Sequence, residues 1–234
     1  MFYYSYELTW TQCKQKVHGE IMDDIKDVQL VECEKSNYIK PIRVLFTQNG
    51  RKRAWDAMKV HDSVAILIYN SSRNVFILVK QFRPAVYINA AKSVQDETGN
   101  VTIDHTKYPG SLGLTYELCA GIVDKEKSVA EIAQEEILEE CGYKVTTESL
   151  RRITGFRNGV GTSAAYQDMF YVEVTDEMKV SPGGGNQHEG ELIDIVEIPL
   201  SEGRTFMMDE SKPKHVGVMF AIMWFYENIQ SKKV

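Results

Sequence analysis

The chain has 234 residues, of which 43% are hydrophobic and 26% are charged, and its formal net charge is −6. This length and composition are those of a globular protein with a full hydrophobic core. The acidic balance argues against a nucleic-acid-binding surface, and no apolar run is long enough to cross a membrane. The first ten residues lack a basic start followed by an apolar run, so we expect no signal peptide and a cytoplasmic protein.

The cysteine pattern also favours an intracellular protein. Cys13, Cys33, Cys119 and Cys141 form no Cys-x-x-Cys pair, and histidine is sparse near them. We therefore expect buried, reduced thiols rather than a zinc site or a disulfide framework.

Extended segments begin the chain. The aromatic run at 2–10 predicts a short strand or an arm that packs on another surface, and 28–36 predicts a further strand. Asn49 and Gly50 separate two extended runs, which is a strong signal for a β-hairpin. We expect residues 1–60 to form an N-terminal antiparallel β extension.

The main domain, residues 61–234, begins with the most apolar part of the sequence. Two nearly continuous apolar runs, 63–69 and 75–82, flank a polar turn at 70–74 and predict a central hairpin buried on both faces. The polar, glycine-containing segment 89–113 predicts a long surface loop. Residues 114–121 predict a strand.

One internal helix has clear boundaries. Ser128 is a good N-cap, Glu131 stands where its capping-box partner belongs, and Gly142 is a stop signal after Cys141. Later segments predict three strands and a terminal helix, at 150–156, 167–175, 191–200 and 215–230. Strands dominate, so we expect an α+β fold or a mixed three-layer fold.

This helix carries carboxylates on its apolar face. At about 100° per residue, Glu136 and Glu140 fall inside the apolar sector and Glu139 lies at its edge. The helix offers Glu136 and Glu140 no basic residue three or four positions away, so burial leaves them without a partner. A hard cation such as Mg²⁺ would resolve this. The alternative, a solvated face with basic partners, fits Glu131 and Glu135 better.

The segment from Gly121 to Tyr143 resembles the Nudix box, G-x5-E-x7-R-E-U-x-E-E-x-G-U, in which U is aliphatic or aromatic. The positions that match are Gly121, Glu136, Ile137, Glu139, Glu140, Gly142 and Tyr143. Lys127 replaces the first glutamate of the box, and Glu135 replaces its arginine. In the family these two residues tie the loop to the helix, so the departures bear on the loop rather than on the metal-binding glutamates.

Segments outside the box extend the resemblance from about residue 40 to the end of the chain. Residues 59–87, 116–121, 159–175 and 189–200 are similar to the UDP-glucose pyrophosphatase (UDP-sugar diphosphatase) branch, a relative of the ADP-ribose pyrophosphatases. The resemblance implies a Nudix fold, with a mixed β-sheet sandwiched between helices (α/β/α). It also implies a homodimer built through the N-terminal β extension.

The implied reaction is Mg²⁺-dependent hydrolysis of UDP-glucose to UMP and glucose 1-phosphate, with Mn²⁺ as a substitute cation. Hydrolysis of ADP-ribose to AMP and ribose 5-phosphate is a related activity that the resemblance allows. A catalytically weak nucleotide-sugar-binding module is the alternative, motivated by Lys127 and Glu135.

The resemblance also assigns residues to the metal and to catalysis. Glu136 and Glu140 are the expected metal ligands, with Glu139 third and the backbone carbonyl of Ala120 completing the set. Relatives take a catalytic base from a mobile loop late in the chain. Here we expect Glu189 to be the base and Glu191 its metal-side partner, with Glu139 and Glu140 also part of the catalytic group. The glycines at 183–185 would give the loop its mobility.

Three residues are expected to bind substrate. Arg83 follows a central strand and suits a clamp on a phosphate or a ribose. Glu117 suits a contact with substrate or metal, and a structural tie to Arg83 is an equal alternative. Trp55 suits stacking on the base, with core or dimer packing as the alternative.

Overall fold

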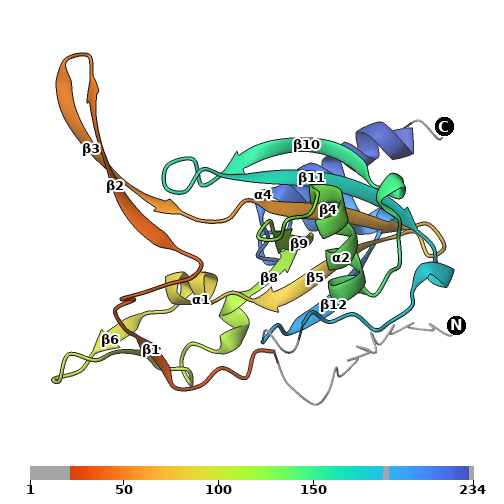
Figure 1. The fold of residues 1–234 in the computed structure, drawn as a ribbon. Coiled ribbons are helices and arrows are strands. Elements are labelled where there is room, and N and C mark those ends of the chain that lie inside the picture. The colour runs from red at the N-terminus through yellow and green to blue at the C-terminus, as the bar shows by residue number, and fades with distance from the viewer. Residues whose placement is uncertain (1–21, 187–189, 232–234) are drawn as a thin grey trace, which may run out of the picture.

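The computed structural model describes residues 22–186 and 190–231, so Cys13, Glu189 and the strand expected at 2–10 lie outside the described residues. Within that part of the chain, a seven-stranded mixed sheet forms the body of the protein (Figure 1). Its main path runs β10–β11–β4–β5–β12, that is Arg151–Asn158, Ala165–Val174, Ser63–Asn70, Val75–Phe82 and Ile193–Pro199. Strands β4 and β11 are parallel, and the other pairs are antiparallel.

Two short strands, β8 (Leu114–Glu117) and β9 (Cys119–Ile122), insert between the strands of the central hairpin. Strands β4 and β5 pair only near their turn, between Ile68–Asn70 and Val75–Ile77. Beyond that point β8 pairs with β5, and β9 pairs with β4. The sequence predicted one strand here, but the chain breaks at Leu118 so that its two halves can join different neighbours. The inserted strands β8 and β9 place Glu117 and Ala120 in the middle of the sheet.

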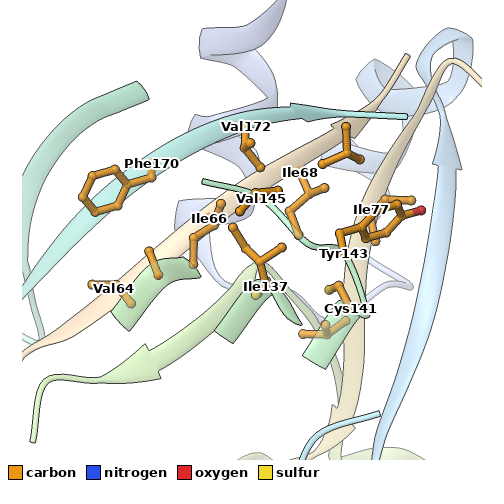
Figure 2. Packing of buried hydrophobic residues seen from close by; sticks show 14 of the residues in the cluster. Val64, Ile66, Ile68, Ile77, Ile137, Cys141, Tyr143, Val145, Phe170 and Val172 are labelled. Carbon is orange, nitrogen blue, oxygen red and sulfur yellow. The ribbon is translucent and has the colours of Figure 1, made fainter. Parts of the chain in front are cut away.

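Helices cover both faces of the sheet, as the apolar runs of β4 and β5 predicted. Helix α2 (Val129–Cys141) packs against Ile66 and Ile68 on one face, and Figure 2 shows Ile137 pointing at them. Side chains alternate along a strand, so Leu67 points to the other face. There it packs with α4 (Val216–Phe225) and the short helix α3 (Gly203–Met208), which the sequence did not predict.

The two ends of α2 confirm the N-cap, capping-box and stop residues that the sequence predicted. The Ser128 hydroxyl accepts a hydrogen bond from the Glu131 backbone N–H at 3.3 Å, and the Glu131 carboxylate accepts one from the Ser128 N–H at 2.8 Å. Gly142 closes the helix in the left-handed conformation, with φ of 74°. Glycine adopts this conformation without the steric cost that a Cβ would bring. The bounds of the helix that carries the acidic residues therefore follow from short-range chemistry.

The segment predicted as an irregular surface loop, 89–113, contains secondary structure. Its strands β6 (Ser93–Gln95) and β7 (Val101–Ile103) pair with each other, and β7 pairs with β1 (Val28–Leu30). The short helix α1 (Pro84–Ala90) extends into its first two residues, and a 3-10 turn (Gly110–Gly113) ends it. These elements are too short to give a periodic sequence signal.

The predicted N-terminal hairpin is confirmed. Strands β2 (Lys40–Gln48) and β3 (Arg51–Lys59) pair along their whole length and project from the body (Figure 1). Asn49 and Gly50 form the turn, with φ of 50° and 73°. Both values are positive, as a two-residue hairpin turn of type I′ requires.

The cysteine prediction holds at two positions and fails at a third. Cys119 and Cys141 are buried between the sheet and α2, whereas Cys33 is exposed. Among the helices that the structure describes, none has the length and apolar character needed to span a membrane.

Candidate active site

Glu140 is the most deeply buried charged residue of α2, with 3% of its surface exposed. Its Oε2 atom accepts a hydrogen bond from the Ala120 backbone N–H at 3.0 Å. Burial raises the pKa of Glu140 to about 8; bonds from Cys119 and Ala120 act in the opposite direction, and the charges of Glu136 and Glu191 add to the rise. The protein holds this carboxylate where ionisation is unfavourable unless positive charge is supplied.

Glu136 lies beside Glu140 and shares its environment. Burial raises the pKa of Glu136 to about 7, and the neighbouring charges of Glu139 and Glu191 contribute, while Lys125 offsets part of the effect. The carboxylate rests on Gly121, where an added Cβ would stand 2.0 Å from Glu136 Oε1. Any residue other than glycine at 121 would therefore displace the carboxylate.

The glycine-rich loop after β11 is tied to the end of α2. The N–H groups of Gly184 and Gly185 donate to the carbonyls of Glu140 and Glu139, at 2.9 and 3.2 Å. Gly183 has φ of +72°, and a Cβ there would lie 2.4 Å from the Glu140 carbonyl oxygen. These glycines allow a close approach that satisfies carbonyls at the helix end, and the mobility expected of the loop stays a prediction.

This attachment brings Glu191 to the acidic residues of α2. The Glu191 Oε2 atom accepts a hydrogen bond from the Asn186 N–H at 3.0 Å. The charge of Glu191 raises the pKa of both Glu136 and Glu140. The structure therefore groups Glu191 with the glutamates of the box, although more than fifty residues separate them in sequence.

The chemistry of these donors, though not their present arrangement, suits a hard divalent cation. In the described ranges, no three His, Cys, Asp or Glu side chains converge closely enough to hold an ion as they stand. The Glu140 carboxylate is turned instead to the Ala120 N–H. The same ranges contain no ion pair from Lys or Arg to Glu136 or Glu140. Clustered carboxylate oxygens with raised pKa and no paired cation are the chemistry that Mg²⁺ accepts. Glu139 is exposed at the rim of this group.

Arg83 is held in a fixed orientation next to the carboxylates. Its Nε and Nη2 donate to the two oxygens of Glu117 at 2.8 and 2.6 Å. Glu117 also accepts from Thr115 at 2.5 Å and Gln81 at 3.4 Å. Burial opposes ionisation of Glu117, but the bonds and charge of Arg83 together with the Thr115 bond lower its pKa on balance. Of the alternatives for Glu117, the structural tie to Arg83 is present.

The nearby carboxylates of Glu140 and Glu191 also act on Arg83 through their charge. The bond to Glu117 raises the pKa of Arg83 most, and the charges of Glu140 and Glu191 raise it further. A guanidinium fixed by a bidentate bond and facing carboxylates is pre-organised to bind a phosphate that arrives with a cation.

The two departures from the box consensus pair with each other. Lys127 Nζ forms an ion pair with Glu135 Oε1, and Lys125 lies 3.9 Å from the other carboxylate oxygen. The charges are reversed relative to the family pattern, but the loop is still tied to the helix. Sequence reasoning missed this pair because Lys127 lies outside the helix, where helical spacing rules do not apply.

Trp55 lies away from the carboxylates of Glu136, Glu140 and Glu191 in its own chain. It is 58% exposed on β3, and Figure 1 shows this hairpin projecting away from α2. Its Nε1 donates to the Gly161 carbonyl at 3.0 Å, and the Met58 N–H donates to the Thr162 carbonyl at 2.9 Å. The side chain thus fixes the hairpin to the β10–β11 turn.

These features describe an α+β protein with buried carboxylates beside a fixed arginine, and the comparisons with known proteins give its class. No model of a known protein family matches the chain. Individual relatives do. The chain is 46% identical over 215 residues to a uridine diphosphate glucose pyrophosphatase of Bos taurus, covering 88% of this chain and 96% of the relative. It is 42% identical over 217 residues to the protein of the same name in Mus musculus, covering 89% and 97%.

A GDP-mannose pyrophosphatase of Citrobacter koseri is more distant. It is 28% identical over 141 residues, which are 60% of this chain and 61% of the relative. The chain belongs to the Nudix hydrolases, in the group of nucleotide-sugar pyrophosphatases.

Proposed function

We propose that this enzyme hydrolyses UDP-glucose to UMP and glucose 1-phosphate, with Mg²⁺ as its cofactor. The observation that carries the proposal is the similarity over nearly the whole chain to two mammalian proteins named for UDP-glucose pyrophosphatase activity. The bacterial GDP-mannose pyrophosphatases match over a shorter region and at lower identity. They support the reaction class more than the choice of substrate.

Residues of α2 and its neighbours would hold the cation. We assign Glu136 and Glu140 as ligands, with Glu139, Glu191 and the Ala120 carbonyl as further donors; Mn²⁺ would suit the same oxygens. The raised pKa values of Glu136 and Glu140 support the assignment. When bound, a divalent ion supplies neutralising charge at the diphosphate and makes a bound water more acidic.

The protein's own contribution is to position the substrate. Arg83 would clamp a phosphate oxygen or a ribose with the N–H groups that Glu117 does not use. Glu117 would hold the guanidinium plane rather than contact substrate, since two donors already bond each of its oxygens. Glu189 remains our candidate base. The tie between the glycine-rich loop and α2, which brings nearby Glu191 to the carboxylates, supports this choice.

The alternative of a catalytically weak binding module was motivated by Lys127 and Glu135. Their ion pair replaces the tie that the consensus residues would make, which removes that motive. The test is turnover of UDP-glucose, ADP-ribose and GDP-mannose with Mg²⁺ by purified protein. We expect UDP-glucose to have the highest kcat/KM. A preference of tenfold or more for either of the other two substrates would contradict the proposal.

We also propose a cytoplasmic homodimer with the α/β/α arrangement of the family. The free thiols at Cys33, Cys119 and Cys141 support a reducing compartment. On the hairpin, Ile42, Val44 and Trp55 alternate onto one face and are all exposed. An apolar strand surface of this kind marks an interaction site, and we assign it to a second copy. Light scattering should give twice the chain mass, and Val44→Asp should yield a monomer. A wild-type monomer would overturn the assignment.

A further inference from the structure

A short segment before α4 extends the sheet beside β8. The Tyr116 N–H donates to the Pro213 carbonyl at 2.8 Å, and Tyr116 pairs with Lys214 in a parallel bridge. His215 follows directly and still has extended backbone angles, with φ of −74° and ψ of 147°. The segment 213–215 therefore acts as an added strand next to the one that carries Glu117.

The alternation of side chains places His215 on the same side as Glu117. Tyr116 and Lys214 both contact Phe206, at 5.4 Å between ring centroids and 5.2 Å from Nζ to the ring. They share the sheet face that α3 covers. The next residue on each strand, Glu117 and His215, must point to the opposite face. On that face Glu117 binds Arg83.

One nitrogen of His215 has a fixed role. Its Nδ1 accepts a hydrogen bond from the Gly217 N–H at 3.0 Å and so caps α4. A neutral imidazole that accepts at Nδ1 carries its proton on Nε2. Within the described residues this Nε2–H makes no hydrogen bond, and the residue is exposed. The cap thus orients a donor on the face that carries the Arg83–Glu117 pair.

We propose that His215 is a further substrate-binding residue whose Nε2–H donates a hydrogen bond to a hydroxyl of the sugar half of the nucleotide sugar. This inference rests on the proposed function. Arg83 bonds Glu117 directly, on the face that His215 shares, and the charges of Glu140 and Glu191 also act on it, so Arg83 neighbours both the carboxylates and the face that carries His215. A group that contacts His215 therefore lies beyond the diphosphate. The Nε2–H group is a neutral, directional donor beside Glu117, whose two oxygens already accept two hydrogen bonds each. Such a donor suits a sugar hydroxyl better than a flat base, which is bound by stacking.

The test separates the cap from the donor. His215→Ser keeps an N-cap oxygen but removes Nε2–H, and His215→Asn keeps both a cap oxygen and an amide donor of shorter reach. We expect His215→Ser to raise the KM for UDP-glucose and to lower kcat/KM about three- to tenfold, with an unchanged melting temperature. Glucose 1-phosphate should inhibit it correspondingly less well as a product, inhibition by UMP should stay the same, and His215→Asn should recover part of the loss.

Two results would overturn the inference. If His215→Ser has the kcat/KM of the wild type and the same inhibition by glucose 1-phosphate, His215 is only a helix cap. If UMP inhibition weakens instead, the donor serves the nucleotide half and the sugar assignment is wrong. A wild-type enzyme that does not hydrolyse UDP-glucose would be a failure of the proposed function, and the same experiment detects it separately.

Discussion

Helix α2 carries two sets of glutamates that differ in what neutralises them. In its outer set, Glu131 closes the capping box with Ser128, and Glu135 pairs with Lys127. In its inner set, Glu136 and Glu140 face the sheet and have raised pKa values of about 7 and about 8. The residues are the same type on the same helix. The difference lies in the partners that the fold provides.

The comparison separates structural from functional carboxylates. A glutamate with a cap or a lysine lowers the free energy of the folded state modestly and needs nothing else. A buried glutamate among other carboxylates raises that free energy, and carboxylates of this kind cluster at functional sites. The inner set should therefore be sensitive in activity and tolerant in stability, whereas the outer set should show the reverse.

The largest expected effect is on catalysis by the inner set. Glu140→Gln should lower kcat/KM for UDP-glucose on the order of a thousandfold, since loss of a metal ligand removes several kcal/mol of transition-state stabilisation. The matched control is Glu135→Gln, the same chemical change in the outer set. It should keep activity within about tenfold, because Glu135 acts through the loop. Equal losses in the two variants would remove the distinction between the sets.

A smaller effect is expected at the Arg83 clamp. Arg83→Lys keeps the charge but loses the bidentate geometry, so kcat/KM should fall about 10- to 100-fold. Arg152→Lys is the control, because Arg152 on β10 also forms an arginine–carboxylate pair, with Asp168 at 2.8 Å, although through a single carboxylate oxygen. Steady-state kinetics should show little change for the control. If both variants lose activity alike, the clamp has no special role.

The pH dependence of stability should also distinguish the sets. The folded-state pKa of Glu140 is raised to about 8 from an ordinary value of 4.5, so the metal-free folded state binds the proton more tightly than the unfolded state. Its stability should be highest below about pH 4.5 with respect to this group, and should fall as pH rises through about 8. Urea unfolding with a chelator, at pH 5.5 and 8.5, measures the loss.

In Glu140→Gln the fall in unfolding free energy between pH 5.5 and 8.5 should be smaller than in the wild type, by on the order of 2 kcal/mol. Added Mg²⁺ should stabilise the wild type more at pH 8.5 than at 5.5, because metal binding requires the ionised carboxylate. Parallel curves for wild type and variant would show that Glu140 titrates normally.

The smallest effect is expected in the outer set. Lys127→Glu places two carboxylates together and should cost about 0.5 to 1 kcal/mol of unfolding free energy, because both partners are more than a third exposed. The double variant Lys127→Glu with Glu135→Lys should restore most of that loss. A double-mutant cycle by denaturant unfolding gives the coupling, and a coupling near zero would mean that the ion pair does not tie the loop.

Local signals made part of the molecule predictable. Ser128, Glu131 and Gly142 mark the ends of α2 within a few residues of chain, and Asn49 with Gly50 marks the hairpin turn. These features depend on backbone groups close in sequence, which propensity and capping rules describe. The buried position of Glu140 followed from helical periodicity for the same reason.

Features that depend on long-range pairing were not predictable. The break at Leu118 exists because β8 and β9 pair with different strands, and nothing within residues 114–122 specifies those partners. The Lys127–Glu135 pair joins a loop to a helix, and His215 reaches the site only because residues 213–215 lie against β8. Histidine spacing in the sequence gave no reason to single out His215.

The most direct test of the account is cation binding by the inner set. Isothermal titration of Mn²⁺ into wild-type protein and into Glu136→Gln and Glu140→Gln variants, at pH 8.5 in the presence of UMP, measures it without turnover. We expect saturable binding to the wild type and a loss of affinity of at least about tenfold in each variant, while Glu135→Gln binds normally. Unchanged affinity in both inner-set variants would contradict the claim that these buried carboxylates hold the metal.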